Sequence, residues 1–109
     1  MPLISKVRDK IITTDNLVLK VSPWKKNKMK VAFTNGCFDI LHLGHLEILT
    51  KSKEFGDRLI VAVNSDESVR KLKGKERPIN DFQTRSNMLA SFSFVDYVVE
   101  LSLIHISEP

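Results

Sequence analysis

Two of the chain's three histidines, His42 and His45, lie three residues apart where a β-prone run gives way to a helical pattern. At a helix start this spacing can place both side chains on the same side. The first helical turn also has unpaired backbone N–H groups and the positive end of the helix dipole, which favour a bound anion. Gly44, between the histidines, would let the backbone approach a bulky ligand. We therefore predict a phosphate-binding site in which the imidazoles donate hydrogen bonds to phosphate oxygens.

Two other interpretations of these histidines are weaker. A single histidine near a helix start is more often structural, but two of them flanking a glycine in one loop favour a binding function. A zinc site is the second alternative. It would have only Asp39 or Cys37 as further ligands, and this set lacks the usual spacing of a Cys/His zinc site. We therefore expect no protein-bound metal.

The elements that must position this loop alternate between strands and helices. The run 59–63 is continuously apolar and β-branched, which is typical of a strand buried on both faces of a parallel sheet. The alternation of strands and helices along the chain describes βαβ units with right-handed crossovers. It therefore predicts an α/β fold with a Rossmann-like parallel sheet. The loop that carries His42 then lies at the carboxyl ends of the strands, where such sheets bind ligands. The patterns predict strands at residues 31–34, 59–63 and 95–101, and helices at residues 44–55, at 66–72 and after residue 80.

Turn and cap residues predict where these elements begin and end. The pair Asn35-Gly36 is a turn signal that ends the first strand, and Gly56 is expected to cap the helix before it. Ser65 is a good N-cap for the second helix. Asn80 as N-cap, with Gln83 three residues later, imitates a capping box at the start of the third helix.

The composition limits the chain to one small domain. It has 109 residues, and 17 Lys and Arg against 13 Asp and Glu give a net charge of +4, which suits phosphate-bearing ligands without indicating a nucleic acid. The single cysteine, Cys37, excludes an internal disulfide. The longest apolar run is far shorter than a membrane span, and charged residues interrupt any signal-peptide core, so we expect a cytoplasmic protein. Residues 1–28 form a leader with one or two short helices, where Pro23 breaks or starts the second.

One segment resembles a known family. Residues 36–45, Gly-Cys-Phe-Asp-Ile-Leu-His-Leu-Gly-His, match every fixed position of the G-x-F-D-x-x-H-x-G-H signature of the cytidylyltransferase-like nucleotidyltransferases. The similarity continues through residues 56–66, 72–74 and 77–80 and at Arg85. It is greatest to the adenylyltransferase domain of the heptose-phosphate enzymes, which makes ADP-heptose for bacterial lipopolysaccharide. It covers residues 29–100, which we interpret as the N-terminal part of a nucleotidyltransferase domain.

The resemblance implies transfer of an adenylyl group from ATP to a sugar 1-phosphate, with release of pyrophosphate and no covalent intermediate. Mg²⁺ would be carried in by the triphosphate. A cytidylyltransferase for glycerol phosphate or a phospho-amino-alcohol is the alternative within the family. The resemblance implies catalytic roles for His42, His45 and Lys73; contacts to the nucleotide from Asn35, Gly36, Cys37, Phe38, Asp39, Gly44, Lys71 and Arg85; and contacts to the sugar phosphate from Asn64, Asp66 and Arg77.

Several of these residues also have a plainer interpretation. Lys71 and Lys73 could belong to a solvated basic stretch, and a loop has no period that would tell which of them faces phosphate. Arg85 by itself would be a surface residue on the polar side of its helix. Asp39 could orient the loop instead of touching substrate, and residues 64–66 could form a simple helix cap.

The resemblance ends at Glu100, and we expect the chain to be C-terminally incomplete, with residues 101–109 (LSLIHISEP) of foreign origin. The family's domain usually continues with two further strands and a loop that grips the nucleotide. The implied partners are the two substrates and either a second copy of the chain or a sugar kinase domain, with no nucleic acid and no membrane. An inactive fragment that binds nucleotide without turnover is therefore a further alternative.

Overall fold

Three parallel strands form one sheet in this computed structural model, which describes residues 2–102. The strands are β1 (Val31–Gly36), β2 (Arg58–Asn64) and β3 (Tyr97–Leu101), and they lie in the order β1-β2-β3. The register pairs Val31 with Arg58 at one end of β1 and Ile60 with Tyr97 at the start of β3. The predicted α/β fold with a parallel sheet is confirmed. Five helices accompany the strands in the described part of the chain: α1 (Leu3–Arg8), α2 (Thr14–Lys26), α3 (Leu43–Glu54), α4 (Asp66–Lys73) and α5 (Phe82–Ala90).

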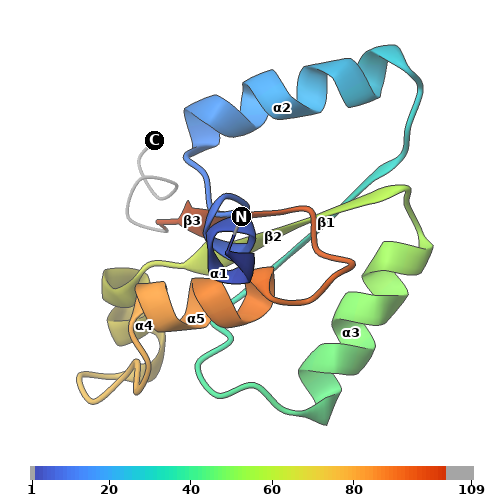
Figure 1. Cartoon of the computed structure of the whole chain (residues 1–109). Coiled ribbons are helices and arrows are strands. Elements are labelled where there is room, and N and C mark those ends of the chain that lie inside the picture. The colour runs from blue at the N-terminus through green and yellow to red at the C-terminus, as the bar shows by residue number, and fades with distance from the viewer. Residues whose placement is uncertain (1, 103–109) are drawn as a thin grey trace, which may run out of the picture.

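The central strand β2 supplies side chains to two hydrophobic layers. Leu59, Val61 and Val63 pack on the face covered by α3 and α5, whereas Ile60 and Ala62 pack on the face covered by α2. Figure 1 shows this arrangement, with α2 along one side of the sheet and α3 and α5 on the other. Since a strand alternates its side chains between faces, only a continuously apolar strand suits a sheet covered on both sides.

The N-terminal leader is part of this packing. The backbone of residues 10–12 runs beside β3, where Val98 donates to the Lys10 carbonyl and accepts from the Ile12 N–H. Helix α2 then covers one sheet face through Leu17, Val21 and Trp24. One or two helices were expected in residues 1–28, and two are present.

Pro23 neither breaks nor starts a helix, because it lies inside α2. Side chains from β2 and β3 stabilise the last turn of this helix. Trp24 stacks on Tyr97 with ring centroids 5.5 Å apart, and the Arg58 guanidinium lies 5.4 Å from the Trp24 ring centroid. These tertiary contacts stabilise a turn in which proline removes one backbone hydrogen bond.

Several predicted boundaries are wrong by a few residues. Asn35-Gly36 is not a turn, because both residues pair with β2 and extend β1. Gly56 is not the cap of α3, which is Phe55. Glycine is required there for packing, since a Cβ would lie 2.9 Å from the Ala32 nitrogen and the Lys30 carbonyl oxygen.

Two further boundary differences concern α5 and β3. Asp81, not Asn80, is the N-cap of α5, and its side chain accepts from the Thr84 N–H. Asn80 is engaged elsewhere, in hydrogen bonds to Asp39. The strand β3 begins at Tyr97, two residues later than expected. Ser65 is the N-cap of α4, as predicted.

Candidate functional site

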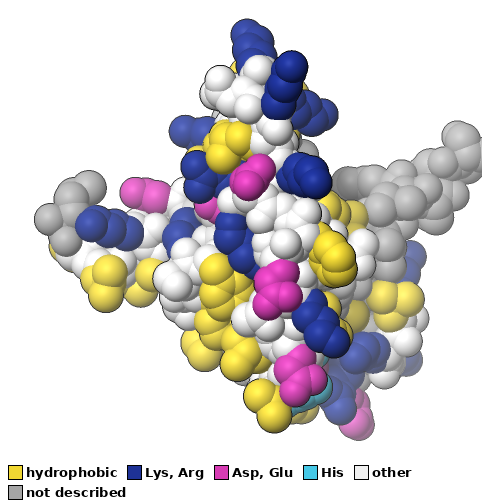
Figure 2. Space-filling view, turned by 90° about the vertical axis from the view of Figure 1, so that its right-hand side faces the viewer, with side chains coloured by type: hydrophobic (Ala, Val, Ile, Leu, Met, Phe, Trp, Pro, Cys, Tyr) yellow, Lys and Arg dark blue, Asp and Glu magenta, His cyan; other side chains and the backbone are white. Residues whose placement is uncertain are grey.

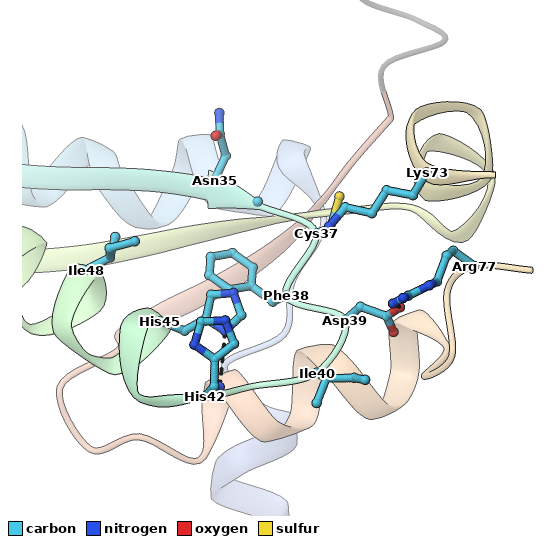
Figure 3. A pocket seen from close by; sticks show the side chains of 11 residues that line it. Asn35, Cys37, Phe38, Asp39, Ile40, His42, His45, Ile48, Lys73 and Arg77 are labelled. Carbon is cyan, nitrogen blue, oxygen red and sulfur yellow. Dashed lines mark hydrogen bonds and ion pairs between the residues drawn. The ribbon is translucent and has the colours of Figure 1, made fainter.

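A cavity of about 370 Å³ opens at the carboxyl end of β1, between the loop that follows it and the start of α3 (Figure 3). Ile40 and Ile48 line it without having been predicted. Ile48 follows His45 by three residues, so the helical period could have indicated it. Gly44, Asn64, Asp66, Lys71 and Arg85 were predicted and are not among the lining residues. The lining consists of Asn35, Gly36, Cys37, Phe38, Asp39, Ile40, His42, His45, Ile48, Lys73 and Arg77.

His42 and His45 cap the first turn of α3 reciprocally. The Nδ1 atom of His42 accepts from the Gly44 N–H at 3.1 Å, and the Nδ1 atom of His45 accepts from the His42 N–H at 3.2 Å. This is a capping box in which imidazoles replace the usual hydroxyl and carboxylate. A neutral imidazole that accepts through Nδ1 carries its proton on Nε2. Both rings are therefore fixed as Nε2–H donors.

The two imidazole rings lie against each other, with centroids 4.0 Å apart. Burial lowers the pKa of His45, and the nearby His42 and Lys73 lower it further. The lowered pKa favours the neutral ring at neutral pH, which agrees with its role as a hydrogen-bond acceptor at Nδ1.

Gly36 and Gly44 leave the space that the aromatic rings of the site occupy. A Cβ on Gly44 would lie 2.9 Å from Cε1 of His42, so a glycine is needed for the imidazole to lie over the backbone. Phe38 is buried, has the positive φ of 49° and places its ring 5.3 Å from that of His45. A side chain at Gly36 would meet the Phe38 ring at 3.0 Å. The signature glycines therefore shape the site around aromatic rings.

Asp39 fastens the loop to a segment 40 residues later. Its carboxylate accepts from the N–H groups of Ile79 and Asn80, both at 2.9 Å, and from the Arg77 guanidinium at 3.1 Å. Burial acts to raise the pKa of Asp39, but these three donors outweigh it and hold the pKa below its usual value. The carboxylate is thus committed to the protein, as the structural interpretation of this residue expected.

Two cationic side chains face the histidines across the cavity. Lys73 comes from the last turn of α4 and Arg77 from the loop after it, and both line the cavity. In Figure 3 they lie on one side of the Cys37–Asp39 loop and the imidazoles on the other. Lys71 does not line the cavity, so the structure distinguishes the two lysines that the sequence could not.

We expected Arg85 to lie on the polar side of its helix. Its side chain is instead completely buried. It hydrogen-bonds to backbone carbonyls and to Asp66. Asn64 is also buried, and its amide donates to the Cys37 Sγ at 3.2 Å. Arg85, Asp66 and Asn64 therefore support the loop after β1 through hydrogen bonds and do not line the cavity.

Residues 2–102 contain no group of three or more His, Cys, Asp or Glu side chains arranged to hold a metal ion. Within the same residues, no helix has the length and hydropathy needed to cross a bilayer.

Known proteins match this fold and this loop. The chain belongs to the cytidylyltransferase-like family, whose model matches residues 33–108. The match includes the complete loop with both histidines, which confirms the predicted family. It also extends past Glu100, where we expected the resemblance to end. Most of the tail for which we predicted a foreign origin, residues 103–109, lies outside the described residues.

Curated relatives carry the name bifunctional protein HldE. The protein from Koribacter versatilis is 49% identical over 90 residues, which are 83% of this chain and 18% of the relative. The protein from Campylobacter jejuni strain RM1221 is 57% identical over 75 residues, or 69% of this chain and 16% of the relative. The chain therefore spans less than a fifth of the length of these relatives.

A solved structure supports the same fold. The lipopolysaccharide core biosynthesis protein from Thermoplasma volcanium superposes with a TM-score of 0.63 at 36% identity. The superposition covers 67% of this chain and 58% of the other.

Proposed function

We propose that this chain carries the site of an adenylyltransferase, which transfers AMP from ATP to a sugar 1-phosphate, heptose 1-phosphate, and releases pyrophosphate. The reciprocal cap of His42 and His45 carries the proposal, because it orients two Nε2–H donors beside a cavity that Lys73 also lines. Membership of the nucleotidyltransferase family supports the reaction type. The name of the solved neighbour supports lipopolysaccharide biosynthesis as the setting, and the product would be ADP-heptose.

In this reaction a phosphate oxygen of the sugar 1-phosphate attacks the α-phosphorus of ATP. The new P–O bond forms while the bond to the pyrophosphate oxygen breaks, so no group of the protein becomes covalently attached. Negative charge grows on the oxygens around the α-phosphorus and on the leaving group. The imidazole donors, the Lys73 ammonium and the positive end of the α3 dipole would stabilise that charge, and such transfers depend mainly on positioning and electrostatics.

We assign the acceptor phosphate to Arg77. Its side chain is 42% exposed, it lines the cavity, and one of its nitrogens is held by Asp39. The ion pair orients the guanidinium while leaving donors for a phosphate. Asn64 and Asp66, the other two residues predicted at the sugar phosphate, do not line the cavity.

The residues of the cavity fit a magnesium ion that arrives with the triphosphate. Asp39 is the only carboxylate of the lining, and it is already occupied by three donors. Mg²⁺ prefers phosphate oxygens and water to a site built from protein ligands alone. The ion would neutralise charge on the triphosphate, and the chain's own part is to bind and orient the phosphates.

The test is pyrophosphate release by the purified chain, with Mg-ATP or Mg-CTP as donor and heptose 1-phosphate or glycerol 3-phosphate as acceptor. We expect release only with ATP and the heptose phosphate, and its loss in His42→Asn. Release only with CTP would instead support the cytidylyltransferase alternative. Nucleotide binding by calorimetry without pyrophosphate from any combination would support the inactive binding fragment and contradict turnover by this chain.

A further inference from the structure

The paired strands β1 and β2 separate at their carboxyl ends, directly beneath the candidate site. Their pairing ends with Gly36 opposite Val63. The residues that follow this last pair are Cys37, just after β1, and Asn64, the last residue of β2. Nη1 of Arg85 donates to the carbonyl oxygens of both, at 2.8 Å and 2.7 Å. One guanidinium nitrogen therefore bridges the two chains where the β1–β2 pairing stops.

The remaining nitrogens of Arg85 reach two further segments. Nε donates to the Asn80 carbonyl at 2.9 Å, and Nη2 donates to the Asp66 carboxylate at 2.6 Å. Asn80 belongs to the segment that Asp39 fastens, and Asp66 is the first residue of α4, the helix that ends at Lys73. The fully buried side chain thus ties together the segments that carry most of the cavity wall.

We infer that Arg85 is a positioning residue of the candidate site. Its planar fork sets the separation between the loop after β1, the end of β2, the start of α4 and the segment before α5. The cavity residues that depend on this separation are Cys37, Lys73 and Arg77. This role differs from the phosphate contact that the family resemblance implied, because the guanidinium does not line the cavity. The geometric part stands on the hydrogen bonds alone, whereas its effect on nucleotide binding rests on the proposed function.

The shape of the side chain, and not its charge alone, is required. Four hydrogen bonds in different directions need the rigid fork of a guanidinium, whereas a lysine ammonium offers three donors from a single point. Arg85→Lys should therefore fail to restore the site even though it keeps the positive charge. Arg85→Met, which keeps the length of the side chain without donors, tests removal of the bonds.

Cys37 is a built-in probe of this geometry because it is the chain's only cysteine and is partly exposed. Its carbonyl accepts from Arg85 and its thiol from Asn64. We expect both Arg85 variants to react with Ellman's reagent about tenfold faster than the unchanged chain. A factor of about ten corresponds to the loss of one hydrogen bond that holds the loop closed. Arg70→Met is the matched control, since Arg70 is an exposed arginine of α4. It should leave the rate unchanged.

Reaction through global unfolding must be separated from local opening. The rate is therefore measured at several low urea concentrations, and a local change gives a rate that is nearly independent of urea. Folded Arg85 variants with an unchanged thiol rate, or with a rise that follows global unfolding alone, would overturn the inference. If circular dichroism shows that neither variant folds, Asp66→Ala is used instead, because it removes only the Nη2 contact. An unchanged thiol rate in Asp66→Ala would also overturn the inference.

Calorimetry with Mg-ATP separates this inference from the proposed function. If the unchanged chain binds Mg-ATP, we expect Arg85→Lys to weaken the affinity about tenfold or more. Equal affinity in a folded Arg85→Lys variant would contradict the inference for the site. If the unchanged chain does not bind Mg-ATP, the proposed function fails, and the thiol rates alone decide whether Arg85 positions the loop.

Discussion

Asn80 donates two hydrogen bonds to Asp39 across 41 residues of sequence. The Asn80 N–H donates to the Asp39 carboxylate at 2.9 Å, and the Asn80 side-chain amide donates to the Asp39 carbonyl at 2.7 Å. The loop after β1 and the segment before α5 therefore form one unit. Because the loop carries His42 and the segment carries Arg77, the contact holds two parts of the cavity lining in a fixed relation.

Replacing Asp39 should weaken this unit. Asp39→Asn loses the ion pair with Arg77 and places an amide where backbone donors need an acceptor, so we expect the free energy of unfolding to fall by about 2 kcal/mol. Urea denaturation measures the change. Since the pKa of Asp39 lies below its usual value of 3.8, its contribution to stability is complete above that pH. It is lost as the pH falls through the lowered pKa, and Asp39→Asn should remove that part of the acid sensitivity.

The helix cap formed by His42 and its proposed role in catalysis can be separated by substitution. Asparagine is a good N-cap, so His42→Asn should keep the α3 cap and leave stability within about 0.5 kcal/mol, while His42→Ala should cost about 1 kcal/mol. Both variants lack the Nε2–H donor, and both should lose pyrophosphate release by about 100-fold or more. Activity retained in His42→Asn would mean that the imidazole serves only as a cap.

The pH dependence of stability should report His45. Its pKa is lowered in the folded chain, so the unfolded chain binds the proton more readily. Its contribution to stability is complete above the usual pKa of about 6.5, and it is lost as the pH falls towards the lowered value. Protonation would also end the acceptance at Nδ1 and open the α3 cap.

His45→Gln is the matched control for this pH effect. Glutamine at this position of a capping box can accept from the N-cap N–H but does not titrate. Thermal unfolding between pH 5 and pH 8, taken as a difference between the two chains, isolates the histidine. A difference that does not change with pH would show that His45 keeps an ordinary pKa in the folded chain.

Lys73 and Lys71 form a natural pair for testing the proposed phosphate contact in the cavity. Both belong to the last turn of α4 and both are exposed, but only Lys73 lines the cavity. We expect Lys73→Ala to weaken Mg-ATP binding about tenfold and Lys71→Ala to change it less than twofold, with calorimetry as the measurement. Equal effects would indicate that only the general positive charge of this turn matters.

Gly56→Ala tests the close approach of the α3 end to β1. A Cβ there would lie 2.9 Å from backbone atoms of Lys30 and Ala32, which cannot move without disturbing the strand. We expect a loss of about 1–3 kcal/mol in unfolding free energy, measured by urea denaturation. Glu54→Ala, an exposed change at the last residue of α3, is the control and should have almost no effect. Similar results for the two variants would rule out the packing requirement.

The signature residues could be predicted from the sequence because their chemistry is local. His42 and His45 are three residues apart at a helix start, and the loop stands between a strand and a helix, so neighbouring residues alone predict an anion site there. The α/β order was equally readable, since the apolar run of β2 needs cover on both faces. The family match includes the same ten residues. These features depend on short separations in sequence, for which period and spacing suffice.

The role of the supporting residues was decided by the tertiary structure. Arg85 has the sequence context of a surface arginine, and only the convergence of Cys37, Asn64 and Asn80 on one buried point makes it a clamp. In the same way, Lys73 was distinguished from Lys71 by where α4 ends relative to the cavity. Contacts between segments tens of residues apart depend on how strands and helices pack. The sequence alone therefore determined the fold class and predicted the histidine pair as a phosphate site, and the packing of the sheet determined which side chains hold that loop in place.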